Sequence, residues 1–152
     1  MIIVKKSEYV LNEIEKTELH KLLKTSFPDF FHNRIYAKQL PHFRFLAKVE
    51  NKIVGQVGLD YRAISVDGKV FKFFGVIDLC VEKAYQGQKI AAKLLNEVEM
   101  LAEKYNVDFT VLFADDHRLY KQLGFNLKKN KCIWLGIDEH KSLRIINEIL
   151  DD

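Results

Sequence analysis

The fold is decided by the stretch from Val76 to Leu95, which reads VIDLCVEKAYQGQKIAAKLL. It opens with an apolar run rich in branched residues, long enough for a buried strand, and continues through a short polar turn around Gly87. From Ile90 onward the apolar residues recur at helical spacing, which predicts an amphipathic helix that begins near Gln88. Free N–H groups at such a turn and the helix dipole attract negative charge, so the stretch predicts an anion site suited to a pyrophosphate.

The glycine pattern separates the nucleotide-binding alternatives. Neither G-x-G-x-x-G nor G-x-x-x-x-G-K-[ST] occurs, which argues against a dinucleotide fold and a P-loop. The turn instead reads YQGQKIA over Tyr85–Ala91, and it resembles the acetyl-coenzyme A loop, [QR]-x-x-G-x-[GA], of the GCN5-related N-acetyltransferases (GNAT). Gln86 and Ala91 match the ends of this pattern. Lys89 stands where the family usually has glycine, which is compatible with a helical backbone there. An ordinary strand–turn–helix junction is the alternative interpretation of the same residues.

Length and composition indicate one globular domain. The chain has 152 residues, of which 48% are hydrophobic and 30% charged, and a length of this order buries about two thirds of the unfolded surface. A net charge of +3 is too small to argue for nucleic acid. We find no signal-peptide pattern and no apolar run of the ~18 residues that a membrane span needs, so we expect a cytoplasmic protein with no membrane partner.

The cysteines and histidines indicate neither a disulfide framework nor a metal site. Cys80 and Cys132 both lie in apolar, strand-like runs, and we expect buried free thiols there. No cluster of histidine, cysteine and aspartate has ligand spacing, so no metal is predicted.

Alternation and turn signals predict the elements that surround the opening stretch. In the first half we expect a strand over 1–5, a helix over 15–26, a short helix within 29–40, and strands over 43–49, 53–65 and 70–81. Asn51-Lys52 and Asp67-Gly68 are the turns between these strands. Within 43–49 the apolar residues alternate with polar ones such as Arg44, which is typical of a strand with one buried face.

After the long helix, the run 107–114 predicts a strand buried on both faces and parallel to 76–81. A short helix after Asp115, a hairpin over 126–137 and a closing helix over 140–150 complete the expected order.

A second motif agrees with the first. Leu119-Tyr120-x-x-x-Gly124-Phe125 resembles the [FL]-Y-x-x-x-G-F segment that follows the fifth strand in GNAT enzymes, and it stands at that place in the order of elements. The resemblance covers roughly residues 1–138. It implies an α/β GNAT fold, with a mixed, mostly antiparallel twisted sheet of six to seven strands. In such a fold, strands 4 and 5 would be parallel and splayed, and helices would flank the sheet. The expected organisation is a single N-acetyltransferase domain over 1–152 with a C-terminal helix at about 140–150.

The resemblance also implies an activity, which is the transfer of an acetyl group from acetyl-CoA to a primary amine by direct attack in a ternary complex. Tyr120 would be the general acid for the leaving thiolate. The residues implied in cofactor binding are Leu79, Cys80, Val81, Gln86, Gly87, Gln88, Lys89, Ile90, Ala91 and Tyr120. The runs 86–88 and 118–120 look similar to the aminoglycoside 2′-N-acetyltransferase branch.

For the candidate general base and the candidate acceptor-binding residues, the sequence allows both a functional and a structural role. Asp78 among apolar neighbours suits a general base with a raised pKa, and pairing with a lysine or a backbone donor is the alternative. Of Asp115 and Asp116, one is expected to cap the short helix and the other to recognise the amine. The aromatic residues Phe30, Phe31 and Tyr36 form either one wall of a substrate cleft or packing over the sheet.

The resemblance implies a small-molecule or peptide amine as the acceptor, and we expect no nucleic-acid partner. A non-catalytic acyl-CoA-binding module and transfer of a longer acyl group are the alternative functions, and a homodimer stays open.

Overall fold

The computed structural model describes residues 1–31, 33–37, 39–114, 116–138 and 141–150, with only part of the side chains over 130–150. The chain forms two compact units, residues 1–112 and 113–152, which are described separately below. The first unit contains β1 (Ile2–Ser7), a 3₁₀ turn (Glu8–Val10), α1 (Glu13–Ser26), β2 (Phe43–Val49), β3 (Lys52–Val66), β4 (Lys69–Val81), a second 3₁₀ turn (Lys83–Tyr85), α2 (Ile90–Lys104) and β5 (Phe109–Val111).

The sheet of the first unit has the strand order β1-β2-β3-β4-β5. The first four strands are antiparallel neighbours, and β5 is parallel to β4. Two tight turns build the hairpins because both central residues of each have positive φ: Glu50 and Asn51 at 49° and 66°, and Asp67 and Gly68 at 49° and 76°. The second turn is the predicted one, whereas the first lies one residue earlier than predicted.

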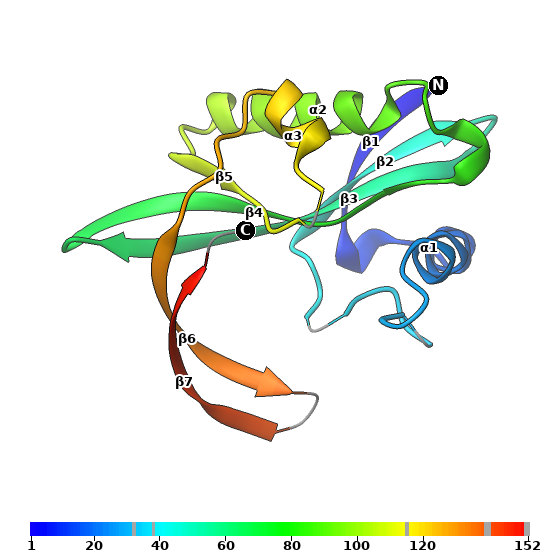
Figure 1. Ribbon diagram of the computed structural model, residues 1–152. Helices are drawn as coiled ribbons and strands as arrows, with labels where there is room; N and C mark the ends of the chain where they lie inside the picture. The colour runs from blue at the N-terminus through cyan, green and yellow to red at the C-terminus, as the bar shows by residue number, and fades with distance from the viewer. Residues whose placement is uncertain (32, 38, 115, 139–140, 151–152) are drawn as a thin grey trace. The chain divides into compact units, whose positions relative to one another are not determined.

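The two long helices cover opposite faces of this sheet, with α2 on one face and α1 on the other (Figure 1). A capping box starts α1, since the Glu15 N–H donates to Asn12 Oδ1 at 2.9 Å and the Asn12 N–H donates to the Glu15 carboxylate at 3.2 Å. α2 covers one face of β2, and on the other face Glu8 and Ile35 cover Arg44 while Leu46 joins the core cluster of α1, so the first five residues of β2 are all buried. The expectation of one buried face for this strand is therefore wrong, and Arg44 is completely buried.

The parallel strands meet only briefly. β4 residues Phe73–Gly75 pair with Phe109–Val111, and β4 then continues to Val81 without a described partner on that side. This arrangement agrees with the expected splaying of strands 4 and 5. β5 is shorter than the predicted strand over 107–114, and Phe109 and Val111 are 45% and 40% exposed. Burial on both faces is thus wrong for β5, which within this unit pairs with β4 alone.

The segment between α1 and β2 is not the short helix that we expected within 29–40. Its described residues form turns and bends. One cause is visible at Ile35, because its carbonyl oxygen accepts a hydrogen bond from the buried Arg44 guanidinium and is thus withdrawn from any helical ladder. Another is Phe31, which is 1% exposed and belongs to the core cluster with Leu19 and Leu23 of α1.

The second unit contains α3 (Arg118–Gln122), β6 (Asn130–Asp138) and β7 (Lys141–Leu150), of which β6 and β7 form a two-stranded antiparallel sheet. The predicted helix over 140–150 is wrong, and the predicted hairpin over 126–137 lies further along the chain. The apolar residues within 140–150 fit both helical and strand spacing. The β-branched Ile145, Ile146 and Ile149 favour the strand, and pairing with β6 satisfies its backbone.

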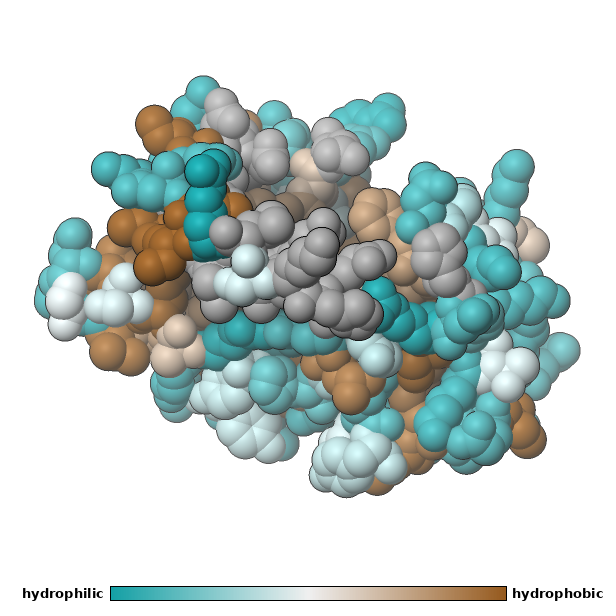
Figure 2. Space-filling model, turned by 90° about the horizontal axis from the view of Figure 1, so that it is seen from below, coloured by the Kyte–Doolittle hydropathy of each residue, from teal (hydrophilic) through white to brown (hydrophobic). Residues whose placement is uncertain are grey.

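The surface is mixed rather than uniformly apolar. Figure 2 shows separate hydrophobic patches between hydrophilic residues over the coloured part of the face that it presents. Within the described ranges, no helix is long and apolar enough to cross a membrane.

Candidate active site

β4 carries the candidate base at an irregular point of the strand. Ile77 lies opposite Gly58 and Cys80 opposite Gln56, so Asp78 and Leu79 together face a single residue of β3, and Asp78 has a φ of 54°. This is a β-bulge, a device that redirects a side chain and ends regular pairing. Aspartate is among the residues that tolerate a left-handed backbone best.

The pKa of the Asp78 carboxyl group is raised, which is the direction that a general base requires. The group is half-buried, and loss of hydration raises its pKa, with a further rise from Asp60 and an opposing effect of Arg44. The alternative role for Asp78 was pairing with a lysine or a backbone donor. Among the described residues, no lysine and no backbone N–H pairs with this carboxylate.

The end of β4 is tied to the turn that follows it. Gln86 Nε2 donates to the Val81 carbonyl oxygen at 3.1 Å, and the Glu82 N–H donates to the Val54 carbonyl oxygen at 2.8 Å. Cys80 is a buried free thiol, as predicted, and burial raises its pKa to about 12. Its side chain is thus inert packing near neutral pH, and only its main chain is available to a ligand. The Cys132 side chain lies outside the described part.

The turn before α2 contains two residues with left-handed backbones. Gly87 has a φ of 78°, and a Cβ placed there would meet nothing within 4 Å, so the space beside its backbone is open. Lys89 has φ 60° and ψ 22° and immediately precedes the first helical residue, Ile90. Lys89 is therefore not helical, and α2 begins at Ile90 rather than near Gln88 as predicted. The conformation of Lys89 explains why the family prefers glycine at this position, because only glycine adopts it without steric cost.

A close contact sets how near α2 lies to the sheet. A Cβ on Gly55 of β3 would lie 3.2 Å from Ile90 Cγ2 and 3.3 Å from the Cys80 carbonyl oxygen. Glycine at this position thus lets the first turn of α2 pack directly on β3 and β4. As a result, the N–H groups at the start of α2, which lack helical acceptors, are held beside the end of β4.

We expect Lys89→Gly to raise the free energy of unfolding by roughly 0.5–1 kcal/mol. A left-handed backbone costs a non-glycine residue about 1–2 kcal/mol, and the greater freedom of glycine in the unfolded chain offsets part of the gain. Urea unfolding measures the change. Lys93→Gly is the matched control on the exposed face of α2, where glycine should instead lower stability by about 1 kcal/mol. A loss of stability in both variants would contradict the left-handed assignment.

The second unit holds the remaining predicted site residues. Tyr120 of α3 is half-buried and packs edge-on against Phe125, with ring centroids 5.9 Å apart, and burial raises the pKa of its phenol. The Asp116 carboxylate accepts hydrogen bonds from the Arg118 N–H at 3.0 Å and from Arg118 Nη2 at 2.6 Å, which lowers its pKa. Asp116 is therefore engaged within its own turn, although His117 is the capping residue. Asp115 lies outside the described residues.

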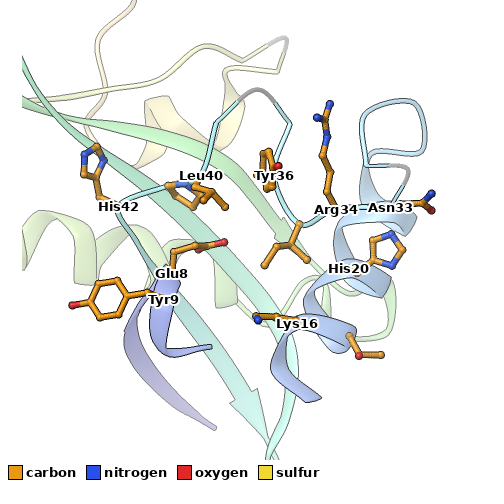
Figure 3. A pocket seen from close by; sticks show the side chains of 12 residues that line it. Glu8, Tyr9, Lys16, His20, Asn33, Arg34, Tyr36, Leu40 and His42 are labelled. Carbon is orange, nitrogen blue, oxygen red and sulfur yellow. The ribbon is translucent and has the colours of Figure 1, made fainter. Parts of the chain in front are cut away.

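A pocket of about 820 Å³ opens in the first unit between α1, the turn after β1 and the segment before β2 (Figure 3). Tyr36 lines it, and the Arg34 guanidinium lies 5.3 Å from the centre of the Tyr36 ring. Phe30 is 62% exposed and is not among the lining residues, whereas Phe31 is in the core. Of the three predicted aromatic residues, only Tyr36 lines this pocket. Phe31 has the packing role that was its alternative.

A buried polar network on the α1 face of the sheet was not predicted from the sequence. Arg44 and Gln56 are hydrogen-bonded to each other, and Glu8 pairs with Arg44 from the pocket side. Asp60 is buried on the same face but accepts hydrogen bonds from Gln39 and Arg62 instead. Asp60 Oδ1 is buried without a hydrogen-bond donor among the described residues, and His42 Nδ1 lies 3.6 Å away. The sequence did hold a signal for these buried polar residues, namely a charged or amide side chain, Arg44 or Gln56, within an otherwise apolar run. Among the residues that the structure describes, no group of three or more histidine, cysteine or acidic side chains lies close enough together to hold a metal ion.

Comparisons with known proteins agree with this geometry. The family model of the acetyltransferase (GNAT) domain matches residues 41–127, which is more than half of the chain. The chain therefore belongs to the GCN5-related N-acetyltransferase family, and it is an N-acetyltransferase.

Solved structures share the fold at low identity. A ribosomal-protein-alanine N-acetyltransferase from Brucella melitensis biovar Abortus 2308 is 22% identical, with a TM-score of 0.64 over 81% of this chain and 91% of that one. A putative acetyl transferase from Pyrococcus furiosus is also 22% identical, with a TM-score of 0.64 over 84% and 93%. An aminoglycoside acetyltransferase from an uncultured soil metagenomic sample is 22% identical, with a TM-score of 0.59 over 80% and 82%.

Proposed function

We propose that the protein transfers an acetyl group from acetyl-CoA to a primary amine of a small molecule or peptide, by direct attack in a ternary complex. The observation that carries the proposal is the continuous path from the β4 bulge at Asp78, through the main chain of Leu79–Val81, to the open turn at Gly87 and the first N–H groups of α2. These residues fit acetyl-CoA, since a strand edge suits the pantetheine amides and a helix start suits the pyrophosphate.

Each group on this path has a role in the proposed reaction. Acetyl-CoA would supply the activated acetyl group as a thioester. The protein would supply charge stabilisation, proton transfer and phosphate binding. Main-chain N–H groups of β4 stabilise developing negative charge on the carbonyl oxygen. Asp78 takes a proton from the amine. Tyr120 is not on this path and belongs to the second unit; the motif Leu119-Tyr120-x-x-x-Gly124-Phe125 alone supports its role, which is to donate a proton to the departing sulfur. The main chain from Gln86 to Ala91 holds the phosphates, with Gln88 and Lys89 at the exposed side of the turn.

The pocket beside Tyr36 is the proposed acceptor site. The pocket is open, and polar side chains such as Glu8, Thr17 and Asn33 stand on a mostly apolar lining, which supports an acceptor with both polar and apolar parts. The first acceptors to test are those that the structural neighbours' names suggest, namely an aminoglycoside and a peptide with an N-terminal alanine. The aminoglycoside branch, the oligomeric state and the cytoplasmic location stay predictions.

A screen of amine acceptors with acetyl-CoA as donor tests the function directly, with detection of the free thiol that transfer releases. Acetylation of at least one primary amine, confirmed by the mass of the product, is expected. Release of thiol that no amine accelerates would mean hydrolysis of the thioester and would contradict the proposal.

Gly87→Ala should weaken acetyl-CoA binding at least about tenfold, because a methyl group at this turn would occupy the space that the pyrophosphate needs. Gly68→Ala is the matched control, since Gly68 has a φ of 76° and an equally open surrounding at the tip of the β3–β4 hairpin. Both changes carry the same backbone cost. Calorimetry of both variants measures the affinity, and equal affinities would exclude the turn as the phosphate site.

A further inference from the structure

The shape of β4 at Asp78 needs support that the strand itself does not provide. Two residues of β4 occupy the space opposite one residue of β3, and the backbone at Asp78 is left-handed. The bulge interrupts regular ladder pairing, so the main-chain groups around it depend on side-chain partners.

Gln56 of β3 supplies that partner. Its side chain is completely buried, and Nε2 donates a hydrogen bond to the main-chain carbonyl oxygen of Asp78. Its Oε1 accepts a hydrogen bond from Arg44 Nη1 at 2.8 Å. An arginine can only donate, so the amide oxygen must face Arg44 and the amide NH₂ must face Asp78. Arg44 thus fixes the orientation of the Gln56 amide.

Arg44 is itself held on three sides. Nε and Nη2 donate to the two carboxylate oxygens of Glu8 at 2.9 and 3.2 Å, and Nη2 also donates to the Ile35 carbonyl oxygen. This two-pronged pairing with a carboxylate fixes the plane of the guanidinium. Glu8 and Ile35 both line the pocket beside Tyr36 (Figure 3). A continuous chain of hydrogen bonds therefore runs from the pocket wall to the bulge.

We propose that Gln56, oriented by Arg44, is a positioning residue of the N-acetyltransferase site, which holds the Asp78 carbonyl and so fixes the bulge. The bulge in turn directs the Asp78 carboxylate and sets the main chain of Leu79–Val81. The inference rests on the proposed function for the roles of these two parts, but the hydrogen bond from Gln56 is independent of it.

Two substitutions separate the orienting hydrogen bond from the packing of the side chain. Gln56→Met keeps the length and removes both polar contacts. Gln56→Glu keeps the shape and the acceptor for Arg44, but its ionised form presents an oxygen to the Asp78 carbonyl. Its protonated form can donate a hydrogen bond to that carbonyl and restore the parental arrangement. Asn96→Asp makes the same change from amide to acid on the exposed face of α2 and is the matched control.

Hydrogen–deuterium exchange followed by mass spectrometry measures how well the main-chain amides around the bulge are protected, and it needs no ligand. In Gln56→Met, peptides that cover 76–82 should exchange faster than in the parent, while peptides over 69–74 of the same strand should not change. Acetyl-CoA affinity should fall about five- to tenfold, the equivalent of one hydrogen bond. Equal exchange over 76–82 in folded Gln56→Met would overturn the proposal.

The pH dependence of Gln56→Glu gives the second test. Its acetyl-CoA affinity, divided by that of the parent at each pH, should recover as the pH falls and the introduced carboxyl takes up a proton. Arg44, Asp78 and Cys80, which lie beside this position, and Asp60, which acts on Asp78, are the same in the parent and in the variant, so the ratio removes their contribution. Gln56→Met should show no recovery.

A constant ratio for Gln56→Glu across pH would overturn the orienting role. If the parent binds no acetyl-CoA, the proposed function fails, and the exchange measurement alone still decides whether Gln56 holds the bulge.

Discussion

Asp78→Asn is expected to lower kcat/KM by about 10²-fold or more, the usual range for loss of a general base. The amide keeps the size of the side chain but cannot accept a proton from the amine. Burial, assisted by Asp60 and opposed by Arg44, raises the pKa of Asp78 above that of a free aspartate. In the parent, kcat/KM should therefore decline as the pH falls through this raised pKa, and that acidic limb should be absent in the variant.

Stability distinguishes a lost base from a damaged fold. Because the folded state raises the pKa of Asp78, it binds this proton more tightly than the unfolded chain does. The contribution to stability is fully present below the unfolded pKa and is lost as the pH rises through the folded pKa. At pH 7 the neutral asparagine should therefore cost no stability, which urea unfolding checks. Glu99→Gln, on the exposed face of α2, is the control for activity. Parental kcat/KM in folded Asp78→Asn at every pH would remove Asp78 from the mechanism.

Tyr120→Phe is expected to lower kcat by roughly 10²-fold, with acetyl-CoA affinity within about threefold of the parent. The change keeps the ring that packs on Phe125 and removes only the hydroxyl group. An unperturbed thiol has a pKa of about 8.5 and an unperturbed phenol one of about 10, so transfer from tyrosine to the departing thiolate is mildly uphill, and the hydroxyl acts as a positioned donor.

The basic limb of the pH–rate profile gives an independent measure of the same group. Burial, with a smaller effect of Asp116, raises the pKa of Tyr120, which keeps the donor protonated to higher pH. The parental kcat should fall as the pH rises through that pKa, and the fall should be missing in Tyr120→Phe. Tyr105→Phe, at the exposed end of α2, should behave as the parent does. A kcat equal to that of the parent across pH would show that the thiolate takes its proton from water.

The centre of the first unit could be predicted because local signals there agree with the tertiary structure. Alternating apolar residues and the Asp67-Gly68 turn predicted β3 and β4, and the helical spacing from Ile90 predicted α2. The family followed from a glycine-containing turn and a tyrosine motif at the right places in the order of elements. Loop geometry was less accessible, since the left-handed conformation of Lys89 contradicts the ordinary preference of lysine.

The parts that failed are those in which a distant segment decides the structure. Arg44 was expected on a solvated face because nothing local shows that Glu8, from the turn after β1, and Ile35, from the segment before β2, cover it. The bulge at Asp78 depends on Gln56, which is 22 residues away in the sequence. The C-terminal strand β7 has a sequence whose apolar residues fit a helix equally well, and only pairing with β6 selects the strand.

Gly55 gives the proposed site a fixed length. The contact of this glycine with Ile90 and with the Cys80 carbonyl sets the separation between the strand proposed to bind the pantetheine and the helix start proposed to bind the pyrophosphate. Because Gly55 has no Cβ, the two parts of the site lie at a fixed distance, and this distance must match the length of the donor between its thioester and its phosphates. A donor with a shorter or longer link between thioester and phosphates would satisfy one end of such a site and miss the other. The proposed site would therefore select its donor by the length of that link, independently of how it selects the acceptor.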